Sequence, residues 1–253
     1  MKLEHKTILI TGASSGLGRA LALSLAGADN RLVVTARREG HLLELQREIE
    51  QRGGRCLVRA ADATDRHQSR AVVDAAVAEF GAIDVAVLNA GGAPAVDMAT
   101  AEVDAVLDVM RKNYDTLVNF LCPIIAHMKQ SGAGTIVYTG SPAGYFGLPN
   151  AGPYSAAKAA GRVLFDTCRI ELARTRIRLV ALYPGFTYTE GLVADEVPFK
   201  SLIIDTERAT REIRRAIERG RAHAMFPRRI RLLMALGRLV PEPLRRRVLA
   251  ALG

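Results

Sequence analysis

Short apolar runs alternate with longer amphipathic stretches along most of the chain. Seven runs rich in β-branched and other apolar residues predict strands at Thr7–Thr11, Leu32–Thr35, Cys56–Ala60, Val85–Leu88, Thr135–Thr139, Ile177–Tyr183 and Ala222–Phe226. Between them, helical periodicity covers residues 16–26, 39–51, 66–80, 100–130, 154–174 and 206–219. Several strand segments are apolar at every position, as in a parallel sheet covered on both faces. The alternation therefore predicts right-handed β-α-β crossovers and a doubly wound α/β sheet.

The pattern changes after the last expected strand. Nothing divides residues 1–226 into smaller units, since no Ser/Pro/Gly-rich linker, low-complexity tract or repeat occurs there, so we expect a single domain. Beyond it, Arg228–Val240 and Leu244–Leu249 combine apolar residues with arginine clusters, and a Pro-Glu-Pro break at 241–243 separates them. The sequence thus predicts a basic, amphipathic helical extension over residues 227–253.

The formal net charge of +9 belongs entirely to the C-terminal part of the chain. Residues 211–253 hold 12 arginines and 3 acidic residues, so residues 1–210 are balanced. The main domain thus has no basic excess, and aromatic residues make up only 5% of the chain, which disfavours nucleic-acid binding. The extension suits helices lying on anionic lipid. A helical flap that covers the substrate cleft or a partner subunit, with its arginines in water, fits the same pattern.

The sequence carries no indication of secretion, membrane spanning or metal binding. The N-terminal segment leads directly into the apolar run at Ile8–Ile10 and lacks the core of a signal peptide. No stretch of about 18 uncharged apolar residues occurs. The cysteines Cys56, Cys122 and Cys168 are widely spaced and the five histidines are scattered. We expect a cytoplasmic protein without a metal, with peripheral membrane association through the extension as a further possibility.

A glycine-rich turn follows the first expected strand and opens the first helix. From Thr11 to Gly18 it reads Thr-Gly-Ala-Ser-Ser-Gly-Leu-Gly. Glycines permit a tight turn and let backbone N–H groups approach a pyrophosphate at the positive end of a helix. The position between strand and helix makes this a dinucleotide-binding signal. The expected contacts are Gly12, Ser14, Ser15, Gly16, Leu17 and Gly18.

The end of the second expected strand bears on the choice of cofactor. An NAD enzyme usually carries an acidic residue about 20 residues past the glycines, to hold the ribose 2′-hydroxyl. This strand instead ends Thr-Ala-Arg-Arg, at residues 35–38. The guanidinium of Arg37 suits a 2′-phosphate, which favours NADP, while the neighbouring Glu39 leaves NAD possible. Two solvated arginines at the start of a helix are the alternative interpretation.

Tyr154 and Lys158 form the candidate catalytic pair. Residues four apart on a helix project from the same face, so the phenol and the ammonium can share one small volume. A free phenol titrates near pH ~10, and a neighbouring cation lowers that pKa. The pair can then act as a general acid and base at an alcohol or carbonyl oxygen, and Ser141 can hydrogen-bond the same oxygen. The alternative is a packed tyrosine beside a solvated lysine.

These fragments together resemble the short-chain dehydrogenase/reductase family over about residues 5–190. The matching pieces are the Thr-Gly-x-x-x-Gly-x-Gly turn at 11–18, Asp62, Asn89-Ala90-Gly91, Asn113, Ser141, Tyr154-x-x-x-Lys158 and Pro184-Gly185. Each fragment is only modestly specific, but the series stands in the right order and mostly at expected strand ends. The resemblance implies a Rossmann-like fold, with residues 1–226 as a dinucleotide-binding catalytic domain.

The resemblance also implies a role for each matching residue. Tyr154 would be the proton donor and acceptor, Ser141 would polarise the substrate oxygen, Lys158 would lower the tyrosine pKa and bond the nicotinamide ribose, and Asn113 would anchor a relay water. Asp62 and Ala63 would face the adenine, and Asn89, Ala90 and Gly91 would border the ribose. Pro184, Gly185, Thr187 and Thr189 would contact the nicotinamide and pyrophosphate. A local turn or helix hydrogen bond is the alternative for Asn89 and Asn113.

The implied activity is NADP(H)-dependent interconversion of a carbonyl and an alcohol. Specificity is expected in residues 143–153 and 186–205, whose apolar side chains favour a hydrophobic ketone, aldehyde or alcohol: Tyr145, Phe146, Leu148, Phe186, Tyr188, Leu192 and Phe199. Ordinary packing explains most of them equally well. A homodimer through the 100–130 and 154–174 helices is expected. The rival hypotheses are a non-catalytic nucleotide-sensing or membrane-surface protein on the same fold, and an epimerase or dehydratase.

Overall fold

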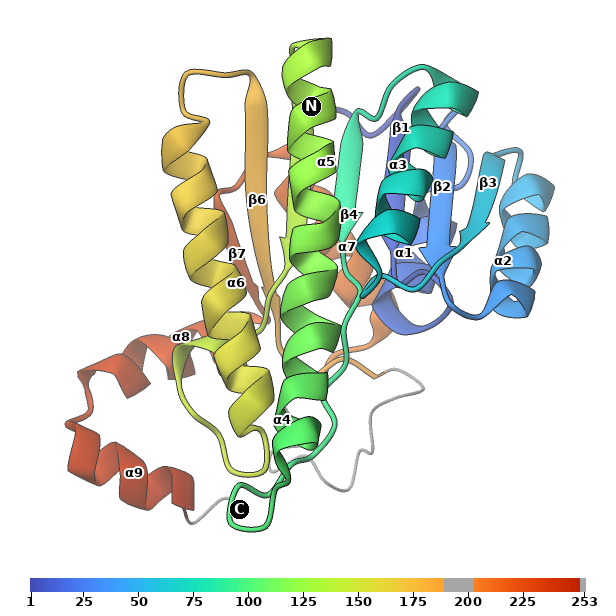
Figure 1. Cartoon of the computed structure of the whole chain (residues 1–253). Helices are drawn as coiled ribbons and strands as arrows, with labels where there is room; N and C mark the ends of the chain where they lie inside the picture. Colours follow the sequence, from blue (N-terminus) through green and yellow to red (C-terminus); the bar gives the residue numbers. More distant parts are fainter. Residues whose placement is uncertain (189–202, 251–253) are drawn as a thin grey trace.

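The computed structural model describes residues 1–188 and 203–250 of the chain. Within them, seven strands form one sheet: β1 (Thr7–Thr11), β2 (Arg31–Ala36), β3 (Arg55–Ala60), β4 (Val85–Leu88), β5 (Gly134–Thr139), β6 (Ile177–Pro184) and β7 (His223–Phe226). Their order is β3-β2-β1-β4-β5-β6-β7, and every neighbouring pair is parallel. The doubly wound parallel sheet expected from the sequence is confirmed (Figure 1).

Helices cover both faces of this sheet. They are α1 (Gly16–Leu25), α2 (Glu39–Gln51), α3 (Arg66–Phe80), α4 (Val103–Met110), α5 (Thr116–Ser131), α6 (Gly152–Glu171) and α7 (Thr206–Glu218). Figure 1 shows α3, α5 and α6 in front of the sheet, with α1 and α7 behind it. Each β-to-β connection through these helices is the crossover that a parallel sheet requires.

The strands pack into two apolar layers, one on each face of the sheet. Ile8 and Ile10 of β1 belong to the layer that contains Leu21 of α1, whereas Leu9 belongs to the layer that contains Phe120 of α5. Successive side chains of a strand point to opposite faces, so a strand covered on both sides is apolar throughout. All five residues of β1 are buried, in agreement with its sequence.

The helix expected over residues 100–130 is divided in the structure. A π-helical turn, η1 (Arg111–Asp115), separates α4 from α5, and the N–H of Thr116 bonds to the carbonyl of Arg111, five residues back. Such a turn inserts one residue while the apolar spacing on either side stays helical, so the sequence pattern did not reveal it. π-turns inside helices are frequent at functional sites.

The C-terminal extension forms two short helices. β7 leads through a cis Phe226–Pro227 peptide bond into α8 (Arg228–Leu239), and α9 (Glu242–Ala250) follows. The two helices expected there are confirmed. Figure 1 shows them beside the lower end of α6, outside the three layers of the domain. Across the described ranges, no helix combines the length and the apolar character needed to cross a bilayer.

Candidate active site

The turn after β1 is locked against the end of β4. The hydroxyl of Thr11 accepts hydrogen bonds from the N–H groups of Asn89 and Ala90 at 2.9 and 3.0 Å. A Cβ atom at Gly12 would lie 2.9 Å from the Cα of Ala90, and one at Gly18 would lie 2.3 Å from the carbonyl oxygen of Gly12. Glycine is therefore required at both positions. β1 has β2 on one side and β4 on the other, so these turns lie where strand order reverses and ligands bind in such sheets.

The first turn of α1 offers backbone donors at this edge. Ser15 is the N-cap residue, yet its side chain makes no capping hydrogen bond within the described part of the chain. The first N–H groups of a helix have no intrahelical partner, and together with the helix dipole they attract an anion. Gly16 has a positive φ of 55°, which a residue with a side chain rarely adopts. This glycine cradle fits the pyrophosphate of a dinucleotide.

Arg38 rather than Arg37 reaches the glycine turn. Its guanidinium Nη2 donates to the hydroxyl of Ser14 at 3.1 Å; Arg37 and Arg38, which follow β2, are both exposed. From the sequence, Arg37 alone was expected to bind a 2′-phosphate. The doubled arginine was the available signal, because adjacent residues at a strand end direct their side chains differently.

Ser141, Tyr154 and Lys158 converge at the neighbouring strand end. Ser141 follows β5 and begins the 3-10 turn η2 (Pro142–Tyr145), where its hydroxyl accepts from the N–H of Ala143 at 3.1 Å. The same hydroxyl is hydrogen-bonded to the phenol of Tyr154 on α6. The ammonium of Lys158, one turn later, lies 5.6 Å from the centroid of the Tyr154 ring and donates to the carbonyl of Thr139 at 3.1 Å.

Burial dominates the electrostatics of this cluster. Lys158 is only 5% exposed, and desolvation lowers its pKa to about 8. Burial also raises the pKa of Tyr154, and the hydrogen bond from Ser141 opposes that rise. The tyrosine pKa thus moves opposite to the direction expected from the sequence. The reason is that removal from water penalises the phenolate by more than its neighbours stabilise it.

Asn113 joins the cluster from the π-turn. Its side-chain oxygen accepts from the N–H of Gly92 at 3.2 Å, and its side-chain nitrogen donates to the carbonyls of Gly92 and Val109 at 2.7 and 3.0 Å. A Cβ atom at Gly91 would lie 2.7 Å from that oxygen and 3.5 Å from the nitrogen of Lys158. The segment after β4, η1 and α6 therefore meet at one point.

The remaining expected residues occupy the same edge of the sheet. Asp62, after β3, holds its own turn, because its carboxylate accepts from the N–H and hydroxyl of Thr64 at 2.9 and 2.8 Å. The side-chain nitrogen of Asn119 on α5 donates to the carbonyl of Ala63 at 3.0 Å. The sequence did not indicate this support for the turn after β3.

After β6, Pro184 ends the strand, the N–H of Gly185 donates to the carbonyl of Phe226 at 2.8 Å, and Thr187 is buried. Thr189, Leu192 and Phe199 lie outside the described residues.

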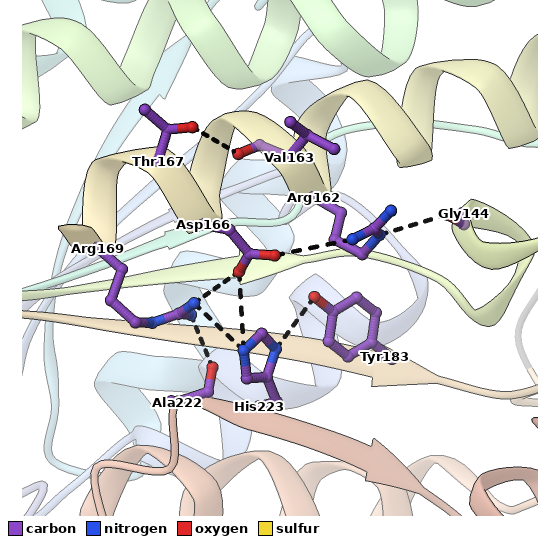
Figure 2. A network of polar contacts seen from close by, with 9 residues as sticks. All are labelled: Gly144, Arg162, Val163, Asp166, Thr167, Arg169, Tyr183, Ala222 and His223. Atoms are coloured by element: carbon purple, nitrogen blue, oxygen red, sulfur yellow. Dashed lines mark hydrogen bonds and ion pairs between the residues drawn. The ribbon is translucent and has the colours of Figure 1, made fainter. Parts of the chain in front are cut away.

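A polar network supports η2 from the side of α6 (Figure 2). Arg162 lies 4.9 Å from the Tyr145 ring centroid, donates to the carbonyl of Gly144 at 3.5 Å and pairs with Asp166 at 3.8 Å. Asp166 also pairs with Arg169 at 2.6 Å, and Arg169 donates to the carbonyl of Ala222 at 2.9 Å. These contacts connect the turn that carries Ser141 through α6 to the start of the edge strand β7.

Comparison with known proteins agrees with this geometry. A family model described as short chain dehydrogenase matches residues 6–196. The chain belongs to the short-chain dehydrogenase/reductase family. Among its relatives, an uncharacterized oxidoreductase of Myxococcus xanthus is 30% identical over 243 residues, covering 96% of each chain. The 3-oxoacyl-acyl-carrier-protein reductase FabG of Thermotoga maritima is 34% identical over 204 residues, covering 79% of this chain and 81% of FabG.

Solved structures of the family share the fold. A short-chain type dehydrogenase/reductase from Mycobacterium marinum superposes with a TM-score of 0.82 at 27% identity, covering 89% of this chain and 95% of that one. The family membership expected from the sequence is confirmed. The protein is accordingly an oxidoreductase that acts on carbonyl or alcohol substrates. In the described ranges, no group of three or more His, Cys, Asp or Glu side chains is arranged to hold a metal ion.

Proposed function

We propose that this short-chain dehydrogenase/reductase interconverts a carbonyl and an alcohol on a hydrophobic substrate, uses NADP(H), and employs Tyr154 as general acid and base. The convergence of Ser141 and Tyr154, both half-buried, with the buried Lys158 carries the proposal. NADP(H), when bound, supplies or accepts the hydride. The chain's own contribution is to orient the reactants and to move one proton.

In the reducing direction, Tyr154 donates its proton to the substrate oxygen as negative charge develops there. Ser141 donates a hydrogen bond to the same oxygen and stabilises that charge. The Lys158 ammonium, held by the carbonyl of Thr139, then stabilises the phenolate that remains. Because the pKa of Tyr154 is raised, the phenol keeps its proton at neutral pH and is in the form that reduction needs.

Asn113 would take part in returning a proton to the Tyr154 phenolate after each reduction. Its side-chain amide is already bonded to Gly92 and Val109. A relay water would therefore be held by the main-chain carbonyl of Asn113 within the π-turn, and the amide would fix the position of that turn. This assigns Asn113 a place in the relay without requiring its side chain to face the substrate.

The cofactor would be held by the turns at the carboxyl ends of the strands. The proposed contacts are Gly12, Ser14, Ser15, Gly16, Leu17 and Gly18 for the pyrophosphate, Asp62 and Ala63 for the adenine, Asn89, Ala90, Gly91, Tyr154 and Lys158 for the nicotinamide ribose, and Pro184, Gly185, Thr187 and Thr189 for the nicotinamide side. Arg37 and Arg38 would bind a 2′-phosphate, which favours NADP over NAD.

The arginines provide a test of cofactor preference. Arg37→Ala and Arg38→Ala should each weaken NADPH binding by about 10- to 100-fold and leave NADH binding unchanged, since a hydrogen bond to a charged group contributes about 1.5–3 kcal/mol. Fluorescence titration of both nucleotides measures this, with the exposed Arg66→Ala on α3 as the matched control. Equal losses for NADPH and NADH would remove the argument for the 2′-phosphate.

The described residues that follow β6 include apolar side chains that can line the substrate site. Phe186 and Tyr188, which follow β6, are 37% and 65% exposed and can contact a hydrophobic ligand. Tyr145 is different, because it packs edge-on against Tyr183 at 5.3 Å and so contributes to the support of η2. We therefore place the apolar contacts with the substrate mainly in the segment after β6.

A panel of hydrophobic ketones, aldehydes and secondary alcohols tests the activity. The absorbance of NADPH should fall with carbonyl substrates or rise with alcohols and NADP. Tight nucleotide binding with no turnover across the panel would instead favour the non-catalytic hypothesis. Conversion of a substrate without net change in the nucleotide would favour an epimerase or dehydratase.

We further propose a homodimer through the 100–130 and 154–174 segments, which include α4, α5 and α6. The apolar side chains of Val163 and Ile170 on α6 are 54% and 77% exposed, and Leu107 of α4 is 44% exposed. Burial of such side chains favours association. Light scattering should give twice the chain mass, and Ile170→Glu should reduce it to one chain. An unchanged mass for this variant would place any dimer contact elsewhere.

A further inference from the structure

α8 is apolar on two opposite sides, and the domain covers only one of them. Ile230, Met234 and Gly237 recur at helical spacing and face the body of the protein. Ile230 is 5% exposed, and a Cβ atom at Gly185 would lie 2.9 Å from its Cγ1. A Cβ atom at Gly237 would lie 3.4 Å from the ring of Phe146. One side of α8 is thus used for packing beside the candidate active site.

The opposite side of α8 carries leucines that nothing in the described chain covers. Leu232, Leu236 and Leu239 also recur at helical spacing, and they are 62%, 55% and 80% exposed. Leu233 is 55% exposed beside them. Packing against the domain does not require leucine at these positions, because the helix already buries its other side. Exposed apolar side chains that gather along one stripe mark an interaction surface.

α9 also carries exposed apolar side chains. Leu244 and Val248, four residues apart on the same face of the helix, are 53% and 54% exposed. We call the exposed apolar residues of the two helices the tail stripe: Leu232, Leu233, Leu236, Leu239, Leu244 and Val248.

Arginines accompany the tail stripe. Residues 227–253 contain seven arginines and one glutamate. Arg228, Arg229 and Arg231 are exposed in the first turn of α8, and Arg246 and Arg247 are exposed in α9. A surface that combines exposed leucines with a concentrated positive charge fits a partner with anionic groups at its surface and an apolar layer beneath them.

We propose that α8 and α9 dock this protein on an anionic lipid surface. The tail stripe enters the boundary between headgroups and acyl chains, and the arginines bind lipid phosphates. The contact is peripheral, since α8 with its 12 residues is about 18 Å long, against about 30 Å for a bilayer core.

Charge argues against a second copy of the chain as the occupant. A two-fold contact through the tail stripe would place the arginines of one copy near those of the other, and like charges oppose such pairing. An anionic membrane neutralises them instead. Because α8 also contacts Gly185 and Phe146, docking places the edge of the sheet that carries the candidate site next to the lipid.

Vesicle flotation of the full chain tests this proposal. The vesicles are phosphatidylcholine alone or mixed with phosphatidylglycerol. The wild-type protein should float with the anionic vesicles, bind the neutral ones far more weakly, and dissociate at high salt. Leu232→Ser combined with Leu236→Ser should abolish flotation. Arg246→Gln combined with Arg247→Gln should weaken it about 30-fold, from the usual contribution of an arginine near an anionic surface.

Matched controls separate a specific contact from a general change in the surface. Leu43→Ser with Val103→Ser removes two exposed apolar side chains elsewhere, and Arg174→Gln with Arg219→Gln removes two exposed arginines elsewhere. Both controls should float like the wild type, and thermal unfolding verifies that all variants fold.

Three outcomes would overturn the proposal: no flotation of the wild type, tail variants that float like it, or a leucine variant that changes only the oligomeric mass. The last result would assign the stripe to a second copy. Turnover with a water-soluble substrate is measured separately, so failure of lipid binding leaves the proposed enzymatic function standing.

Discussion

Lys158 shows most clearly how a single residue serves this site. Its ammonium is almost fully removed from water, and burial lowers its pKa to about 8 from the usual 10.5. Below pH 8 the folded protein must therefore hold a charge in a medium that disfavours it. This destabilises the fold, and the gain is a cation fixed beside the phenol of Tyr154.

Replacing Lys158 should consequently stabilise the protein. Lys158→Met, measured without added nucleotide, should raise the free energy of unfolding at pH 7 by about 2 kcal/mol. The lowered pKa corresponds to about 3 kcal/mol, and loss of the bond to Thr139 removes about 1.

The lowered pKa of Lys158 also determines how the stability of the wild type changes with pH. The wild type regains this stability as the pH rises from about 8 to 10.5, because the unfolded chain then binds more protons than the folded one. The difference between variant and wild type should therefore shrink over that range. Urea unfolding at several pH values measures it, with the exposed Lys129→Met as control. A destabilised variant at pH 7 would contradict the assigned burial cost.

At the residue scale, the sequence predicted which residues form the site better than it predicted the burial and contacts of their side chains. The glycines at 12 and 18, and the grouping of Ser141 with Tyr154 and Lys158, follow from spacing and residue type. The direction of the Tyr154 pKa and the contact of Arg38 with Ser14 do not. Both depend on how much water each side chain loses and on where neighbouring elements pack, which a linear pattern does not specify.

At the scale of elements, η2 is the piece that positions catalysis. It carries Ser141 at its start, and the ring of Tyr145 packs against Arg162 of α6. Arg162 also donates to the carbonyl of Gly144 (Figure 2). A short 3-10 turn has few internal hydrogen bonds, so contacts from outside determine its position.

Removing Arg162 should disturb this support. Arg162→Met is expected to lower the free energy of unfolding by about 1 kcal/mol, because one cation–π contact and one partly exposed ion pair are lost. It should also lower kcat about tenfold, since a displaced Ser141 stabilises the substrate oxygen less well. NADPH affinity should stay unchanged. Arg174→Met is the control, and a variant with wild-type kcat would show that η2 holds its position without Arg162.

The boundaries of most elements could be predicted to within one or two residues, because apolar runs and turn residues coincide with them. The helices at Glu39–Gln51 and Arg66–Phe80 agree with the expected ranges. The π-turn and η2 were missed, since neither changes the period of the apolar pattern. Both lie at the candidate site, where local geometry departs most from regular structure.

At the scale of the whole molecule, the parallel sheet brings distant segments to one edge. Thr11 ends β1, and Asn89, Ser141 and Gly185 follow closely on the ends of β4, β5 and β6, although all four are widely separated in the sequence. Fold class was predictable because alternation of strands and helices leaves few arrangements open. The packing of α8 beside Phe146 and Gly185 was not, since arginine-rich apolar helices fit a flap and a lipid surface equally well.

We propose that Tyr154 moves the proton at a site where the other cofactor contacts supply most of the nucleotide binding. The most direct measurement compares Tyr154→Phe with wild type in two assays: NADPH binding by fluorescence and turnover of the best carbonyl substrate. Binding should stay within about twofold, and kcat should fall about a thousandfold, in the range that general acid catalysis contributes. Tyr114→Phe should behave like the wild type. Substantial turnover by Tyr154→Phe would contradict the account.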